Sequence, residues 1–275
     1  MFMIEKGIRL GTMTLEDLKK SGGLDTAVRG FGWFYLGPEF CENLLDASVC
    51  EDAARLQGLG RKVCLLTPML SEKGAGLMDS VFKKLLRLKR RGRIDAERLE
   101  ITINDFGALE LAGRNRLPFK LNAGRLLSEN AFESTGDRLK IHNGLGLKFF
   151  RELGITRYEL STTGIRPRTN FSRGGLYGFN PRNLTITLHY PYLNLTSARA
   201  CLVGMPYVPP EESAESVHCA RQCRICSFEI AHPAIKEKLS VRGNTVFLRF
   251  PDKFYGSEKD LAGLRVDRLV YSPFP

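Results

Sequence analysis

Short apolar runs alternate with helical patterns along most of this chain, and this alternation limits the folds open to it. We expect strands at residues 8–10, 33–36, 63–67, 99–103, 119–121, 158–160 and 184–189, with helices that include 47–56, 78–91 and 147–153. Each βα unit must bury one face of its helix against the sheet. The sequence therefore predicts an α/β fold with either an open, doubly wound sheet or a closed barrel.

The glycine pattern favours the closed barrel. An open dinucleotide-binding sheet carries Gly-x-Gly-x-x-Gly after an early strand, and this chain has none. Its densest glycines, Gly174 to Gly178, come late and are interpreted as a turn. A length of 275 residues suits one barrel domain. We predict a TIM-like (β/α) barrel over residues 1–275, complete or distorted, which Val246 to Phe250 and Leu269 to Tyr271 close or cover.

Composition and charge narrow the class of protein. The chain is 43% hydrophobic and 26% charged, and no apolar run has the length of a membrane helix. The first seven residues lack the features of a secretory signal, so we expect a cytoplasmic protein. The net charge is +11, and much of the excess lies in residues 83–93. That segment is interpreted either as a solvated helix face or as a surface that binds an anion such as RNA.

Four cysteines gather near the C-terminal end, within the cysteine-rich segment 197–230. Cys201, Cys219, Cys223 and Cys226 are separated by seventeen, three and two residues. Prolines between the first two predict a loop. Thiolates at these spacings suit an iron–sulfur cluster or zinc. Buried apolar cysteines and a redox pair at Cys223 and Cys226 are the remaining alternatives.

Four segments resemble a known family. They are Trp33 to Cys41, Thr102 to Leu109, Leu153 to Ser161, and Ser197 to Cys201. In this order they resemble motifs of the collagenase-like peptidases, family thirty-two among peptidases of unknown type. In length the chain resembles the short anaerobic ubiquinone-biosynthesis members, which are iron–sulfur hydroxylation proteins.

The resemblance implies a four-iron four-sulfur (4Fe-4S) cluster held by Cys41, Cys201, Cys219 and Cys223, with Cys226 as an alternative to Cys223. It also implies oxygen-independent hydroxylation of a quinone precursor or an RNA base. A second hypothesis is a non-catalytic, cluster-bearing subunit that forms a heterodimer with a homologous family member. The third is a peptidase, although the chain lacks both His-Glu-x-x-His and Gly-x-Ser-x-Gly.

Two further residues are candidates for catalysis at the barrel mouth. Asp105 follows the strand 99–103 and could act as an acid or base, or cap the next helix. Arg125 follows the strand near 119–121 and could bind an anionic oxygen donor, or form a surface salt bridge. His189 ends a strand and is interpreted as a structural histidine or as a residue facing the site.

Overall fold

Eight parallel strands pair edge to edge and close a barrel, as predicted. The structure, a computed structural model, describes residues 4–11, 13–129, 131–135, 138–162, 168–171, 180, 184–201, 203–205, 207–213, 216–250 and 258–275. Around the barrel the strands run β1, β2, β3, β4, β5, β8, β10 and β15, and β15 returns to β1. Their bounds are Glu5–Gly11, Trp33–Leu36, Lys62–Leu66, Leu99–Ile103, Lys120–Ala123, Arg157–Ser161, Thr185–Tyr190 and Val266–Tyr271. The segment Gly174 to Gly178 lies outside the described residues.

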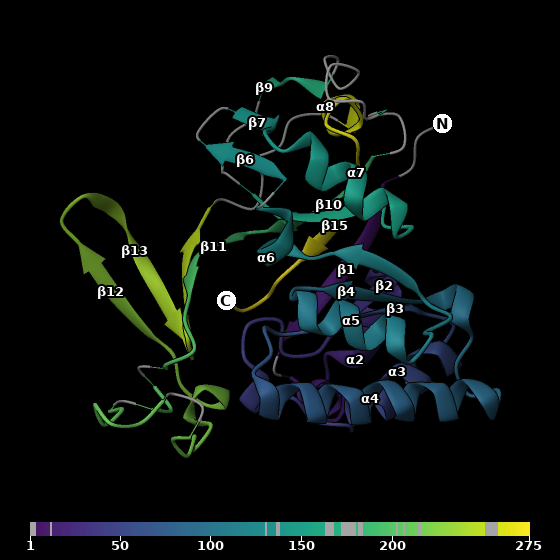
Figure 1. Cartoon of the computed structure of the whole chain (residues 1–275), viewed down its shortest axis with the longest axis horizontal. Coiled ribbons are helices and arrows are strands. Elements are labelled where there is room, and N and C mark those ends of the chain that lie inside the picture. The colour runs from purple at the N-terminus through teal and green to yellow at the C-terminus, as the bar shows by residue number, and fades with distance from the viewer. Residues whose placement is uncertain are drawn as a thin grey trace.

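Helices surround the barrel (Figure 1). They are α1 (Leu15–Lys20), α2 (Leu24–Gly30), α3 (Val49–Gly58), α4 (Glu72–Arg90), α5 (Phe106–Arg114), α6 (Arg125–Ser128), α7 (Gly144–Glu152) and α8 (Glu258–Gly263). In α4, Phe82, Leu85 and Leu88 are buried in the core. The lysines and arginines of this helix therefore line its outer side. None of the helices in the described ranges is both long and apolar enough to cross a membrane.

Two small sheets accompany the barrel. One contains β6 (Phe132–Thr135), β7 (Arg138–Ile141) and β9 (Arg168–Thr169). The other has the order β11 (Tyr192–Ser197), β14 (Thr245–Arg249), β13 (Ile235–Arg242) and β12 (Phe228–His232), and Figure 1 shows the β12–β13 hairpin projecting away from the barrel. Of the two C-terminal runs expected to close or cover the barrel, the later one closes it as β15. The earlier one becomes β14, because its neighbour β13 pairs with it as a hairpin.

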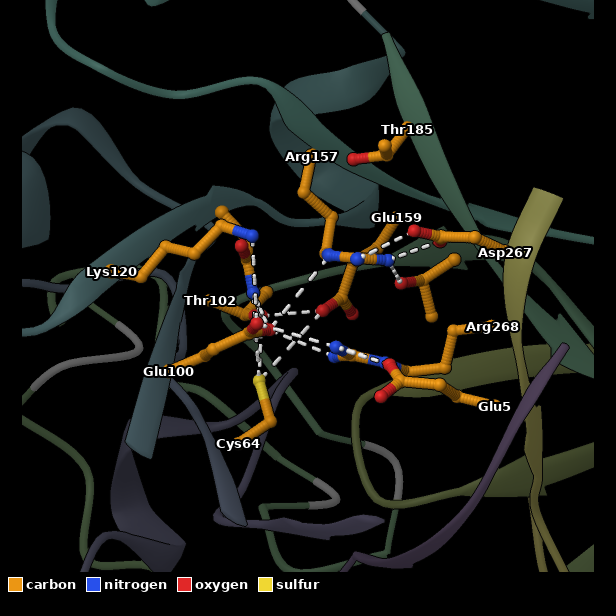
Figure 2. Close-up of polar contacts among 12 residues, drawn as sticks. Glu5, Cys64, Glu100, Thr102, Lys120, Arg157, Glu159, Thr185, Asp267 and Arg268 are labelled. Atoms are coloured by element: carbon orange, nitrogen blue, oxygen red, sulfur yellow. Dashed lines mark hydrogen bonds and ion pairs between the residues drawn. The ribbon is translucent and has the colours of Figure 1, made fainter. Parts of the chain in front are cut away.

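Charged side chains fill the end of the barrel where the strands begin (Figure 2). Arg268 of β15 donates to Glu100 of β4 at 2.8 Å and to Glu5 of β1 at 3.0 Å. Arg157 of β8 donates to Asp267 of β15 through two nitrogens, at 2.5 and 2.8 Å. Functional groups of such barrels lie at the opposite end, so this network is interpreted as part of the folded core.

Candidate functional site at the barrel mouth

The loop after β2 carries Cys41 to the mouth of the barrel, the end at which the strands finish. Gly37 ends the strand with φ of 105°, a left-handed conformation that favours glycine. A Cβ at this position would come within 2.5 Å of the Leu66 carbonyl oxygen of β3. The chain can therefore turn sharply here and run close beside the next strand. Nδ2 of Asn244, in the β13–β14 turn, donates to the carbonyl of Phe40 at 2.7 Å and holds the end of the loop.

Cys201 and Cys219 approach each other around Gly204. The Gly204 amide donates to Sγ of Cys201 at 3.1 Å, and a Cβ on Gly204 would lie 3.0 Å from Sγ of Cys219. Cys223 lies in a short 3-10 turn, Gln222–Arg224, against Gly243 of the same turn that holds Phe40. Glycines therefore lie beside the sulfurs of Cys219 and Cys223, where a larger residue would crowd them.

Two of the four thiols, Cys41 and Cys223, have pKa values that the other cysteines help to raise. Burial raises the pKa of Cys41 to about 12; the amide of Asn43 opposes this rise, and the nearby thiols of Cys223, Cys219 and Cys201 add to it. Burial also raises the pKa of Cys223, and Cys201 and Cys219 add to that increase. Segments about 160 residues apart in sequence thus bring four thiols to one region. In an apolar setting, several thiolates need a compensating cation.

Cys226 differs from these four in exposure and in its contacts. Its thiol is exposed and donates to the carbonyl of Gln222 at 3.1 Å. Cys201 and Cys223, in contrast, are buried. Among the side chains that the structure describes, no group of three or more His, Cys, Asp and Glu is placed so that it could hold a metal ion.

A buried ion pair lies directly before Cys41. Nε and Nη2 of Arg125 donate to the two carboxylate oxygens of Glu39 at 2.8 and 2.5 Å, and Nε of Arg9 lies 3.1 Å from the same carboxylate. Burial alone would raise the pKa of Glu39, but the charge and hydrogen bonds of Arg125 lower it to about 2. Arg125 thus forms a buried ion pair and not the surface salt bridge given as its alternative, because its guanidinium is engaged by Glu39 and by Ser161. Its role in binding a donor stays a prediction.

A cavity of about 580 Å³ lies beside the cysteines, between the mouth and the small sheet that contains β14. Its lining includes Cys41, Cys223 and Cys226, the aromatic rings of Phe40, Phe247 and Phe274, and the charged groups of Arg9, Asp17, Glu39, Arg224 and Arg242. Since Glu39 also pairs with Arg125, the wall has an excess of positive charge. The two terminal nitrogens of Arg9 have no hydrogen-bond partner within the described part of the chain.

The remaining candidates have structural partners. Asp105 caps α5, because its carboxylate accepts from the amides of Gly107 and Ala108. His189 is fully buried in the barrel, where its Nε2 lies 2.7 Å from Oε2 of Glu159. Burial lowers the pKa of His189, which keeps the ring neutral at neutral pH. A catalytic role for Asp105 remains a prediction.

Sequence analysis missed Arg9, Glu39 and Glu159. Each has a signal in the sequence: Arg9 and Glu159 are charged residues inside otherwise apolar strands, and Glu39 stands between a strand end and a cysteine. A buried charge needs a partner. A charged residue in such a position indicates that an oppositely charged partner exists, but the sequence does not identify that partner.

Comparisons with known proteins add little. The chain matches no model of a protein family, and no curated protein matches it. The putative copper homeostasis protein CutC from Streptococcus agalactiae is 15% identical, with a TM-score of 0.41 over 68% of this chain and 88% of that one. A glycoside hydrolase family 18 N-acetylglucosaminidase from Paenibacillus barengoltzii is 7% identical, with a TM-score of 0.39 over 98% and 94%. Likenesses this distant carry no argument about function.

Proposed function

We propose that this chain holds a 4Fe-4S cluster on Cys41, Cys201, Cys219 and Cys223 and takes part in oxygen-independent hydroxylation. The observation that carries the proposal is geometric: Cys41 and Cys223 line one cavity at the barrel mouth, while Cys201 and Cys219 meet around Gly204. Thiolates are the usual ligands of such clusters. The resemblance of four sequence segments to the collagenase-like peptidase family supports the same reading.

The spacing of the cysteines favours a cluster over zinc, because zinc ligand pairs usually have a two-residue gap and only Cys223 and Cys226 offer it. A zinc ion needs its four ligands to converge on one point, with sulfurs about 2.3 Å from the metal. A cluster of several irons and sulfides is wider, so its ligands stand further apart. Gly204 and Gly243 leave room beside the sulfurs of Cys219 and Cys223, where larger side chains would intrude.

The side chains of the cavity would bind and orient the substrates. When bound, a cluster of this kind carries electrons or binds an oxygen-donating substrate. Arg9 and Arg242 would attract an anionic donor, while Phe40 and Phe247 offer a surface for an aromatic quinone precursor or an RNA base. Arg125 would keep Glu39 ionised and so hold the Cys41 loop in place. Asp105 would act as acid or base only if substrate binding freed its carboxylate from the cap of α5.

A second candidate is a cluster-bearing subunit that needs a homologous chain for activity. Its supporting observation is an exposed apolar side chain beside the cysteines: Ile225 lines the cavity and is 91% exposed. A peptidase has no comparable support.

Anaerobic purification tests the proposal directly. We expect a brown protein with about four irons and four sulfides per chain and a broad absorption near the visible range. Colourless protein with one zinc per chain would refute the cluster. Hydroxylation by the purified chain alone, compared with hydroxylation after addition of the homologous chain, separates the two candidate functions.

A further inference from the structure

One helix of the barrel exposes a continuous apolar strip. Leu145, Phe149 and Leu153 follow one another at intervals of four residues along α7 and its C-terminal cap, so they share one face of the helix. Their exposed fractions are 77%, 45% and 46%. The opposite face, with Leu147 and Phe150, is buried in the core. The helix is therefore apolar on both sides.

The neighbouring helix α5 extends this strip. Phe106, at the first position of α5, is 55% exposed. Its ring centroid lies 6.4 Å from that of Phe149 and 6.3 Å from that of Phe150. Four large apolar side chains thus form one surface, the α7 strip, which consists of Phe106, Leu145, Phe149 and Leu153. Exposed apolar side chains gathered in this way mark interaction sites more often than scattered ones do.

Two opposite charges border the α7 strip on its other side. By helix geometry, Lys148 and Glu152 lie on the flank of α7 away from Phe106 and Phe150. Both are exposed, and neither has an ion-pair partner in the ranges that the structure describes. One positive and one negative charge beside an apolar strip give no net preference for an anionic or a cationic partner. They are complementary to a second copy of the same helix that runs in the opposite direction, because each lysine then lies beside a glutamate.

We propose that the α7 strip is an interface between two copies of this chain, packed antiparallel about a two-fold axis. Such an axis brings the same surface of both copies together. Antiparallel packing places Leu145 towards Leu153 of the second copy, near a centre formed by the two Phe149 rings. It also places Lys148 beside Glu152 of the second copy, twice by symmetry. The strip is about one helix long, so the dimer belongs to the small, weakly associated class.

Sedimentation of the full-length protein across a concentration series tests the interface. We expect a monomer–dimer equilibrium in the wild type and a monomer in Leu145→Asp, because this exposed side chain contributes to the strip and not to the core. Leu77→Asp is the matched control, since Leu77 is a 41% exposed leucine on α4. A wild type that stays monomeric at every concentration would overturn the proposal, as would a dimer that persists in Leu145→Asp.

Charge reversal gives a test that folding effects cannot imitate. Lys148→Glu and Glu152→Lys each place like charges across the interface, and each should weaken the dimer by about tenfold. Mixed together, the two variants place opposite charges at both contacts. The mixture should therefore dimerise as well as the wild type does. If the mixture associates no better than either variant alone, the antiparallel arrangement is wrong. Unchanged melting temperatures confirm that both variants are folded.

Discussion

Arg125 and Glu39 form a two-point ion pair inside the barrel mouth, with Nε and Nη2 donating to separate carboxylate oxygens. Both side chains are almost completely buried. Glu39 lies two residues before Cys41, and the intervening Phe40 ring lies 4.9 Å from the Arg125 guanidinium carbon and 5.5 Å from that of Arg9. The loop that carries the first proposed ligand is therefore anchored by charge.

Removing Arg125 should destabilise the protein and loosen this loop. Arg125→Met leaves the Glu39 carboxylate buried with Arg9 as its remaining cation, and the loss of one partner of a buried pair costs roughly 3 kcal/mol. We expect that decrease in the free energy of unfolding by urea, with lower iron retention. Arg114→Met, which removes an exposed ion pair, is the control. Adding Glu39→Gln to Arg125→Met should recover part of the loss. Equal stability of the two methionine variants would contradict the anchoring role.

Replacing single cysteines should separate ligands from bystanders. Alanine at Cys41, Cys201, Cys219 or Cys223 should remove most of the bound iron, because site formation is coupled to folding of these loops. Cys226→Ala should retain it, since that thiol is exposed and bonded to a backbone carbonyl. Iron and sulfide content per chain is the measurement. If Cys226→Ala loses iron while Cys223→Ala keeps it, Cys226 is the fourth ligand.

The lowered pKa of Glu100 allows us to predict how the free energy of unfolding changes at acid pH. Burial alone would raise its pKa, but Arg268 and then Arg157 and Lys120 lower it from 4.5 to about 2. A carboxyl with a lowered folded-state pKa stabilises the protein above its unfolded pKa, and this contribution is lost as the pH falls through the folded value. We therefore expect a loss of about 3 kcal/mol between about pH 4.5 and 2.

Unfolding by urea at several acid pH values checks this prediction in a protein stripped of metal. Glu100→Gln should show a flatter dependence of stability on pH in this interval. Glu110→Gln, on the exposed side of α5, should keep the wild-type dependence. If the stability of Glu100→Gln depends on pH as that of the wild type does, another carboxyl is responsible for the acid sensitivity.

If the substrate is RNA, we expect the basic side of α4 to bind its phosphates. Lys83, Lys84 and Arg93 pair with Asp79 or Glu51, at distances of 2.6 to 3.4 Å. Arg87, Arg90 and Arg91 form no ion pair with any described residue, so they are available to phosphates. Binding to single strands should fall by roughly 0.7 log units per phosphate contact for a tenfold rise in salt.

Changing Arg87, Arg90 and Arg91 to glutamine should weaken RNA binding and flatten its salt dependence. Filter binding at two salt concentrations measures both. Weak binding by the wild type, or an unchanged salt slope in the triple variant, would leave α4 as a solvated helix face. A small-molecule substrate would then be the better reading.

Local sequence patterns predicted the strands of the barrel well. Seven of the eight barrel strands were expected before residue 190, and the expected run at Leu269 to Tyr271 became β15. Apolar runs and helical spacing are local properties, so the chain itself displays them. The β12–β13 hairpin and the β6–β7 pair were missed. Their residues alternate too weakly for a sequence pattern to separate them from loop.

The chain also determined which residue types reach the mouth, because loops after parallel strands finish at one end of a barrel. Only the tertiary structure decided how these residues pair. The sequence left open whether Arg125 binds a donor or forms a salt bridge, and in the structure Glu39 engages it, while Arg9 lines the cavity. Cys223 is buried near Cys41 and Cys226 is exposed, although only two residues separate them. Pairing of charges and thiols depends on distances between segments far apart in sequence, and only closure of the barrel sets those distances.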